Sequence, residues 1–221
     1  MQNKRSHLPA KESIERRPSL VQNVPASLTP LIGREQARVS LSTLLRRPDV
    51  RFVTLTGPGG VGKTCLAWHV ASDLLGDFAD GVSLVSLAAL RDPDLVVPTI
   101  AHTLKLRGAQ EQPLLEQLKA TLREKAHLLL LDNFEQVVEA SPLLIDLLLD
   151  CPHLKLLVTS RAVLHVSGEH EFPVLPLPVP DLRHLPAYEE LAQYAAVALF
   201  HYRGSSAKLM IQRCAYLERH F

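Results

Sequence analysis

The chain has 221 residues, with 24 Lys and Arg against 23 Asp and Glu, so its formal net charge is +1. This balance gives no electrostatic reason to expect a nucleic-acid or membrane-surface partner. No apolar run reaches the length of a membrane span, so we expect no membrane contact. Its three cysteines, Cys65, Cys151 and Cys214, lie too far apart for a disulfide framework, which favours a reducing cytoplasm.

Hydrophobic residues make up 47% of the chain, enough for one good-sized domain plus a fragment. Residues 1–24 are charged and lack periodicity, which predicts a disordered tail. We expect the main domain to cover residues 25–180. The proline-dense stretch 173–186 leads out of it. Residues 181–221 then form a linker and a partial helical region, with a helix over 188–202.

Apolar, β-branched strand patterns alternate with helical patterns along the expected domain. We expect strands at residues 51–56, 81–87, 127–132, 154–159 and 171–175. Helices are expected from about residue 35 to 45, 63 to 75, 93 to 106 and 113 to 122, and from 134 with a restart at 141. This alternation predicts an α/β fold, a parallel sheet with helices on both faces.

The first strand runs into a glycine-rich loop that opens the second helix. Its residues match the pattern GxxxxGK[ST] in full: Gly57, Pro58, Gly59, Gly60, Val61, Gly62, Lys63 and Thr64. Glycines allow the backbone N–H groups to curl around phosphate oxygens, and the helix N-terminus adds partial positive charge. Lys63 can reach the β and γ phosphates, and Thr64 can ligate Mg²⁺. With Cys65, this segment predicts a nucleotide-binding P-loop; the alternative is a loop that only turns.

The strand over 127–132 ends in a carboxylate, Asp132. Parallel strands bring their carboxyl ends to the ligand-binding edge of a sheet, so Asp132 is expected near Thr64, holding Mg²⁺ directly or through water. The alternative role is a helix N-cap. Asn133 follows where many ATPases of this architecture have a glutamate that activates water. Glu135 is the candidate catalytic base, although it could simply complement a helix dipole.

A second candidate for the phosphate edge follows the strand over 154–159, where Ser160 and Arg161 come next. An arginine at this place can pair with γ-phosphate oxygens and sense their loss. The alternative is a surface arginine at a strand end. Together with Lys63, Asp132 and Glu135, Arg161 completes the predicted catalytic set.

These motifs, in this order with the segment 31–35 (Leu-Ile-Gly-Arg-Glu) ahead of them, resemble the NB-ARC or STAND-type P-loop signal-transduction ATPases of bacterial transcriptional regulators. The resemblance implies a three-layer P-loop NTPase fold with strand order 2-3-4-1-5. It also implies that Ile32, Gly33 and Arg34 line the adenine and ribose pocket and that Arg161 contacts the terminal phosphate. Members of the group hold ADP at rest, exchange it for ATP on activation, and then self-associate and expose effector domains.

The chain departs from this group after the nucleotide-binding domain, because the Gly-Leu-Pro-Leu motif of the following helical domain is missing. We therefore expect a truncated product, with DNA contacted only through domains outside this chain. The predicted function is an ATP/ADP switch with slow Mg²⁺-dependent hydrolysis. The alternatives are a turnover ATPase of the AAA-like motor or loader type, a kinase, and a remnant that folds but binds weakly.

Overall fold

The computed structural model describes residues 30–106, 112–180, 190, 193–202 and 204. The predicted tail over residues 1–24 and most of the predicted region 181–221 lie outside the described residues. The described residues 195–202 are helical, in agreement with the helix expected over 188–202, whereas residues 193 and 194 of that range form a turn and a bend instead. Among the described helices, none combines the length and the apolar character needed to cross a bilayer.

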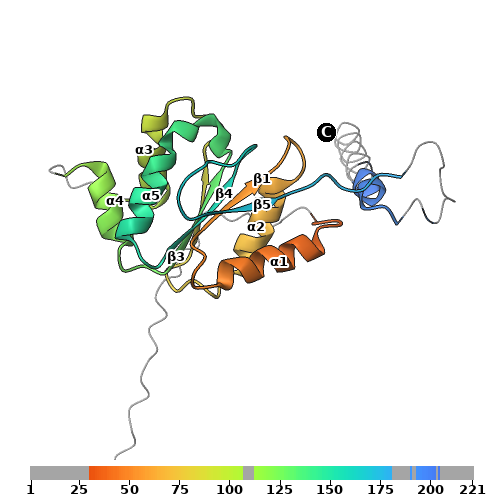
Figure 1. The fold of residues 1–221 in the computed structure, drawn as a ribbon, viewed down its shortest axis with the longest axis horizontal. Helices are drawn as coiled ribbons and strands as arrows, with labels where there is room; N and C mark the ends of the chain where they lie inside the picture. The colour runs from red at the N-terminus through yellow and green to blue at the C-terminus, as the bar shows by residue number, and fades with distance from the viewer. Residues whose placement is uncertain (1–29, 107–111, 181–189, 191–192, 203, 205–221) are drawn as a thin grey trace, which may run out of the picture.

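Five parallel strands form one sheet in the order β2-β3-β4-β1-β5 (Figure 1). The strands are β1 (Phe52–Thr56), β2 (Val82–Ser86), β3 (His127–Asp132), β4 (Leu154–Thr159) and β5 (Glu169–Pro173). The order confirms the predicted α/β fold. It places β4 between β3 and β1, so the loops that follow these three strands come together at one edge.

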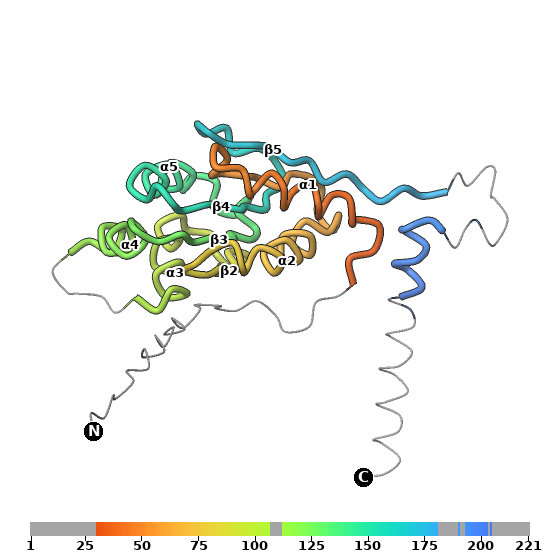
Figure 2. The backbone as a smooth tube through the Cα atoms, turned by 90° about the horizontal axis from the view of Figure 1, so that it is seen from below, coloured from red at the N-terminus to blue at the C-terminus, as the bar shows by residue number. Residues whose placement is uncertain are grey.

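Helices cover both faces of the sheet (Figure 2). They are α1 (Glu35–Arg46), α2 (Lys63–Asp73), α3 (Val96–Thr103), α4 (Leu114–Leu122) and α5 (Ser141–Asp150), with 3-10 turns η1 (Pro93–Leu95), η2 (Phe134–Gln136) and η3 (Val138–Ala140). A hydrophobic core lies on each face of the sheet, and alternate residues of β3 point into one or the other. Leu128 and Leu130 pack with α1 and α2, whereas Leu129 and Leu131 pack with α3, α4 and α5. A strand covered on both faces is therefore continuously apolar, as its sequence is.

Two predicted helices differ in the structure. The helix expected from Phe134 is replaced by two 3-10 turns, because Asn133 has a left-handed backbone (φ 62°) and Val137 leaves helical geometry (φ −139°). The helix expected from Pro93 begins as the turn η1 and becomes α-helical only at Val96.

The fifth strand also begins two residues earlier than expected, because residues 169–173 pair in register with all five residues of β1. Pairing with β1 brings Val174, just past β5, against the start of the glycine-rich loop.

Candidate functional site

The loop between β1 and α2 has a backbone that requires glycine. Gly57, Gly60 and Gly62 have φ values of 143°, 77° and 98°, which side-chain-bearing residues rarely adopt. A Cβ atom on Gly57 would also lie 2.6 Å from the carbonyl oxygen of Val174. The glycines of the motif therefore serve the curled conformation that the sequence predicts.

The outer face of this loop is open. At Gly59, Gly60 and Gly62, a Cβ atom would meet no described heavy atom within 4 Å. Gly62 is the N-cap residue of α2, and no described side chain caps the helix there. The glycines therefore leave open space at the N-terminus of α2, where helix geometry favours an anion.

Lys63 lies at the base of the loop and is 8% exposed. Its Nζ donates to the carbonyl oxygens of Gly57 (2.8 Å) and Pro58 (3.0 Å). Burial lowers the pKa of Lys63, whereas the charge of Glu135 raises it and that of Arg161 lowers it further. Lys63, Glu135 and Arg161 are three of the four predicted catalytic residues. The structure therefore brings these three within electrostatic reach of one another.

Asp132, the last residue of β3, contacts the start of α2 and the end of β4. Its Oδ1 accepts hydrogen bonds from the hydroxyls of Thr64 (2.7 Å) and Thr159 (2.6 Å). Asp132 is 6% exposed. The N–H of Asn133 donates to the Thr159 hydroxyl at 3.0 Å. Asn133, not Asp132, takes the N-cap position of the following turn, so the N-cap alternative for Asp132 is wrong. The contact between Thr159 and Asp132 was not predicted. The only signal for it in the sequence is a hydroxyl at the end of the strand over 154–159.

Glu135 and Arg161 form an ion pair at the same edge. Nε of Arg161 donates to Oε1 of Glu135 at 3.2 Å; the side chains are 67% and 13% exposed, respectively. The second carboxylate oxygen, Oε2, is buried and has no hydrogen-bond partner among the described residues.

A small pocket of about 140 Å³ opens beside the loop. It is lined by Pro30, Leu31, Ile32, Arg34, Gly60, Val61, Gly62, Cys65, Leu177 and Leu199. Arg34 closes one side, because its Nη2 donates to the carbonyl oxygens of Val61 (3.1 Å) and Leu175 (2.5 Å).

The pocket lining overlaps only in part with the residues expected around the base and ribose. Gly33 is not in the lining; its α-carbon faces Ala195, whose side chain would clash with any Cβ atom there. Leu177 and Leu199 were not predicted as site residues. The proline-dense stretch that holds Leu177 was expected to leave the domain, and Leu199 belongs to an apolar stretch with no local motif.

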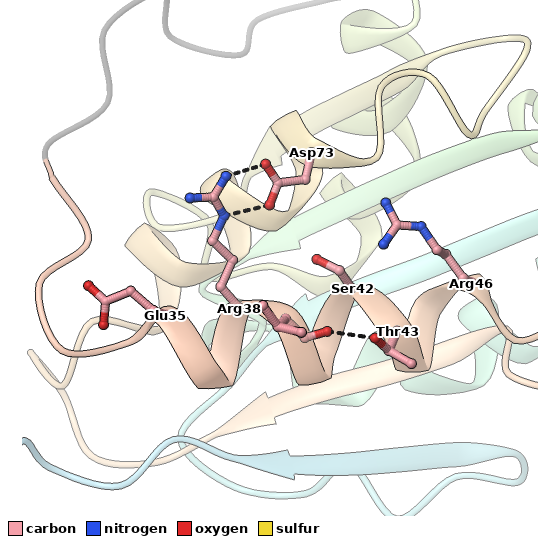
Figure 3. Close-up of a pocket in the computed structure, with 7 residues that line it drawn as sticks. Glu35, Arg38, Ser42, Thr43, Arg46 and Asp73 are labelled. Carbon is pink, nitrogen blue, oxygen red and sulfur yellow. Dashed lines mark hydrogen bonds and ion pairs between the residues drawn. The ribbon is translucent and has the colours of Figure 1, made fainter.

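A larger hollow of about 460 Å³ lies between α1 and α2 (Figure 3). Both arginines that line it are already paired: Arg38 forms a two-point ion pair with Asp73, and Arg46 contacts Asp77 at 3.0 Å. It lacks the open, glycine-rich backbone of the β1–α2 loop. The hollow therefore lacks the features that the sequence predicts for a phosphate site, whereas the β1–α2 loop has them.

The fold and the loop define the class of protein: a parallel sheet of order 2-3-4-1-5 with a GxxxxGK[ST] loop after β1 is a P-loop NTPase. Residues 35–195, well over half of the chain, match the NB-ARC domain. The chain belongs to the NB-ARC domain family, as its motifs indicated.

Curated relatives are much longer than this chain. A Mycobacterium tuberculosis protein named as an HTH-type transcriptional regulator is 34% identical over 132 residues, which cover 59% of this chain and 15% of that protein. The regulatory protein AfsR of Streptomyces griseus is 29% identical over 159 residues, covering 66% of this chain and 16% of AfsR. The matched part of the chain thus spans less than a fifth of the length of either regulator.

Among solved structures, the ORC2 protein of Aeropyrum pernix, determined with ADPNP and ADP, superposes with a TM-score of 0.50 at 17% identity. The match covers 67% of this chain and 50% of the ORC2 chain. At this identity the likeness concerns the fold alone, and it agrees with the P-loop ATPase architecture.

Proposed function

We propose that this chain is a nucleotide-binding switch domain that binds ATP and ADP with Mg²⁺ and hydrolyses ATP slowly. The observation that carries the proposal is the hydrogen bond of 2.7 Å between the Thr64 hydroxyl and Asp132, at the end of an open glycine-rich loop. It brings a hydroxyl oxygen and a carboxylate oxygen together where the terminal phosphates of a bound nucleotide would lie.

The phosphates would be held by the N–H groups of residues 57–65 and by Lys63. Two of the three ammonium donors of Lys63 now face the carbonyls of Gly57 and Pro58. A phosphate oxygen offers this buried cation an anionic acceptor in place of a neutral one, and hydrogen bonds to charged groups are the stronger kind.

Magnesium suits the donors at this edge. Mg²⁺ is usually held by one or two protein oxygens together with waters and substrate phosphates. Thr64 Oγ1 and Asp132 Oδ1 are oxygens of that kind, and the Thr159 hydroxyl orients the carboxylate from the other side. The ion, when bound, neutralises charge on the β and γ phosphates.

The base and ribose would occupy the pocket beside the loop. Ile32 and Val61 offer apolar surface to a purine face, and Arg34 holds the pocket wall in place through two carbonyl oxygens. Gly33 supports this segment from behind, where it leaves room for Ala195. Apolar walls with a few placed polar groups are typical of small-molecule sites.

Arg161 would contact the terminal phosphate, and Glu135 would serve as the base that activates water. Slow hydrolysis follows because Asn133, rather than an acid, comes directly after Asp132, and because Glu135 is engaged with Arg161 in the ligand-free arrangement. A turnover ATPase of the motor or loader type is the alternative function, and steady-state kinetics separate the two.

In this proposal the chain acts within a signal-transducing regulator. The regulators to which it is similar are far longer, so any contact with DNA would come from other domains. Self-association would accompany the ATP state. A cytoplasmic location follows from the proposal, because that compartment supplies ATP.

The test is nucleotide titration of the purified chain with ADP and ATP, read as thermal stabilisation. At a hundred times Kd, binding stabilises a protein by about 2.7 kcal/mol. We expect Lys63→Ala to abolish this gain. Lys125→Ala, at the opposite end of the sheet just before β3, should retain it. Equal stabilisation of the parent and Lys63→Ala would overturn the proposed site, and turnover of many ATP per second would favour the motor-type alternative.

A further inference from the structure

The ion pair between Arg161 and Glu135 joins the segments that follow β4 and β3. The two residues are 26 positions apart in sequence, and Nε of Arg161 lies 3.2 Å from Oε1 of Glu135. Both side chains act electrostatically on Lys63, so the pair lies at the phosphate edge rather than on a remote surface.

The two partners are unequally placed. Glu135 is 13% exposed, and its Oε2 has no hydrogen-bond partner among the described residues. Arg161 is 67% exposed and reaches Glu135 through Nε. A buried carboxylate oxygen without a hydrogen-bond partner costs folding free energy. Among the described residues, the hydrogen bond from Arg161 to Oε1 offsets part of this cost for Glu135. Arg161, in contrast, can turn its guanidinium towards a different anion.

A terminal phosphate is such an anion. Guanidinium groups bind phosphate oxygens through strong, charge-assisted hydrogen bonds. An arriving γ-phosphate would compete with Glu135 for Arg161, whereas ADP has no group at that position. Binding of ATP would therefore separate the pair, whereas binding of ADP would leave it in place.

We propose that Glu135 is a specificity-determining residue that shifts the site towards ADP by holding Arg161 away from the γ-phosphate. This rests on the proposed function, since it assumes that Arg161 contacts that phosphate. The same exchange releases Glu135 only when the terminal phosphate is present. The residue that would activate water is thus restrained until there is a bond to hydrolyse.

The test is the ratio of affinities for a slowly hydrolysed ATP analogue and for ADP, both with Mg²⁺, measured by calorimetric titration. Glu135→Gln keeps the shape of the side chain and removes its charge. We expect this variant to raise the ratio in favour of the ATP analogue by about two- to fivefold, the range that corresponds to a partly exposed ion pair. Glu139→Gln removes a carboxylate from an exposed position four residues further along and should leave the ratio unchanged.

The decisive comparison repeats Glu135→Gln in an Arg161→Ala background. If Glu135 acts by holding Arg161, the ratio should no longer respond to Glu135→Gln there. A response of the same size in both backgrounds would overturn the proposal, because it would show that the carboxylate simply repels the γ-phosphate.

A ligand-free measurement separates this proposal from the proposed function. A double-mutant cycle of Glu135→Gln and Arg161→Ala, followed by urea unfolding without nucleotide, measures the coupling between the two side chains. Coupling in this state supports the pair whether or not nucleotide binds, and additive effects would contradict it. Failure of Lys63→Ala to affect nucleotide binding would instead count against the phosphate site itself.

Discussion

The hydroxyl of Thr159 donates a hydrogen bond of 2.6 Å to Oδ1 of Asp132, which lies 27 residues earlier in the chain. The same hydroxyl accepts the N–H of Asn133 at 3.0 Å. Thr159 is 1% exposed, so neither group has water as a ready substitute. One buried side chain therefore orients the proposed magnesium carboxylate and satisfies the backbone of the turn that follows β3.

Thr159→Val should lower stability and weaken the response to Mg²⁺. Valine keeps the branched shape but leaves the buried N–H of Asn133 without an acceptor, at a cost of about 1–3 kcal/mol. Urea unfolding measures the loss, and Mg²⁺ titration of the nucleotide complex measures the second effect. Thr159→Ser, which keeps the hydroxyl, should behave closer to the parent; indistinguishable Ser and Val variants would contradict this role.

Arg161→Ala should impair discrimination between nucleotides more than it impairs ADP binding. We expect affinity for an ATP analogue to fall about tenfold, within the range for hydrogen bonds to charged groups, with little change for ADP. Calorimetric titration of both nucleotides measures the ratio. Arg91→Ala, which removes an exposed arginine bonded to carbonyls of its own segment, is the matched control. An unchanged ratio in Arg161→Ala would refute a contact with the terminal phosphate.

Gly57→Ala should destabilise the protein, whereas Gly76→Ala should not. An alanine at residue 57 combines a φ of 143° with a Cβ only 2.6 Å from the carbonyl oxygen of Val174, and strain of this kind costs about 1–3 kcal/mol. Gly76 has open space around its Cβ position and no left-handed φ, so alanine is expected to be neutral or to stabilise by up to about 1 kcal/mol. Thermal and urea unfolding measure the stability of both variants. Equal losses of stability in Gly57→Ala and Gly76→Ala would contradict the prediction.

Stability should fall as the pH drops below about 6.5, in part because of His127. This side chain is 1% exposed, with Nδ1 3.0 Å from the carbonyl oxygen of Asp80 and Nε2 3.1 Å from the hydroxyl of Ser83. Burial lowers the pKa of His127 below its unfolded value. The neutral form therefore contributes its full stability above the unfolded pKa, and that contribution is lost as the pH falls towards the folded pKa.

Urea unfolding at a series of pH values between about 7.5 and 5 checks this pH dependence. The parent should lose more stability on acidification than His127→Gln does. His153→Gln, at an exposed position, controls for the loss of a histidine in general. An identical pH dependence of the parent and His127→Gln would exclude His127 as the source.

Much of the fold could be predicted because hydrophobic patterns report burial directly. The continuous apolar run of β3 predicts a strand covered on both faces, and its alternate leucines enter the two cores. The turn after β3 could not be predicted in the same way. The apolar residues over 134–150 resemble one interrupted helix. Asn133, however, adopts a left-handed backbone, and a 3-10 turn follows it in place of the first part of that helix.

The sequence by itself determined the phosphate loop, because its chemistry depends on neighbouring residues: glycines that permit the curled backbone, and a lysine and a threonine that open the helix. Only the tertiary structure decided which side chains share that edge. Thr159 meets Asp132 and Arg161 meets Glu135 because β4 is inserted between β3 and β1. Leu199 likewise reaches the pocket beside the loop from more than a hundred residues away. Such contacts depend on how strands are ordered and how segments return to the sheet, and no local pattern of residues encodes that order.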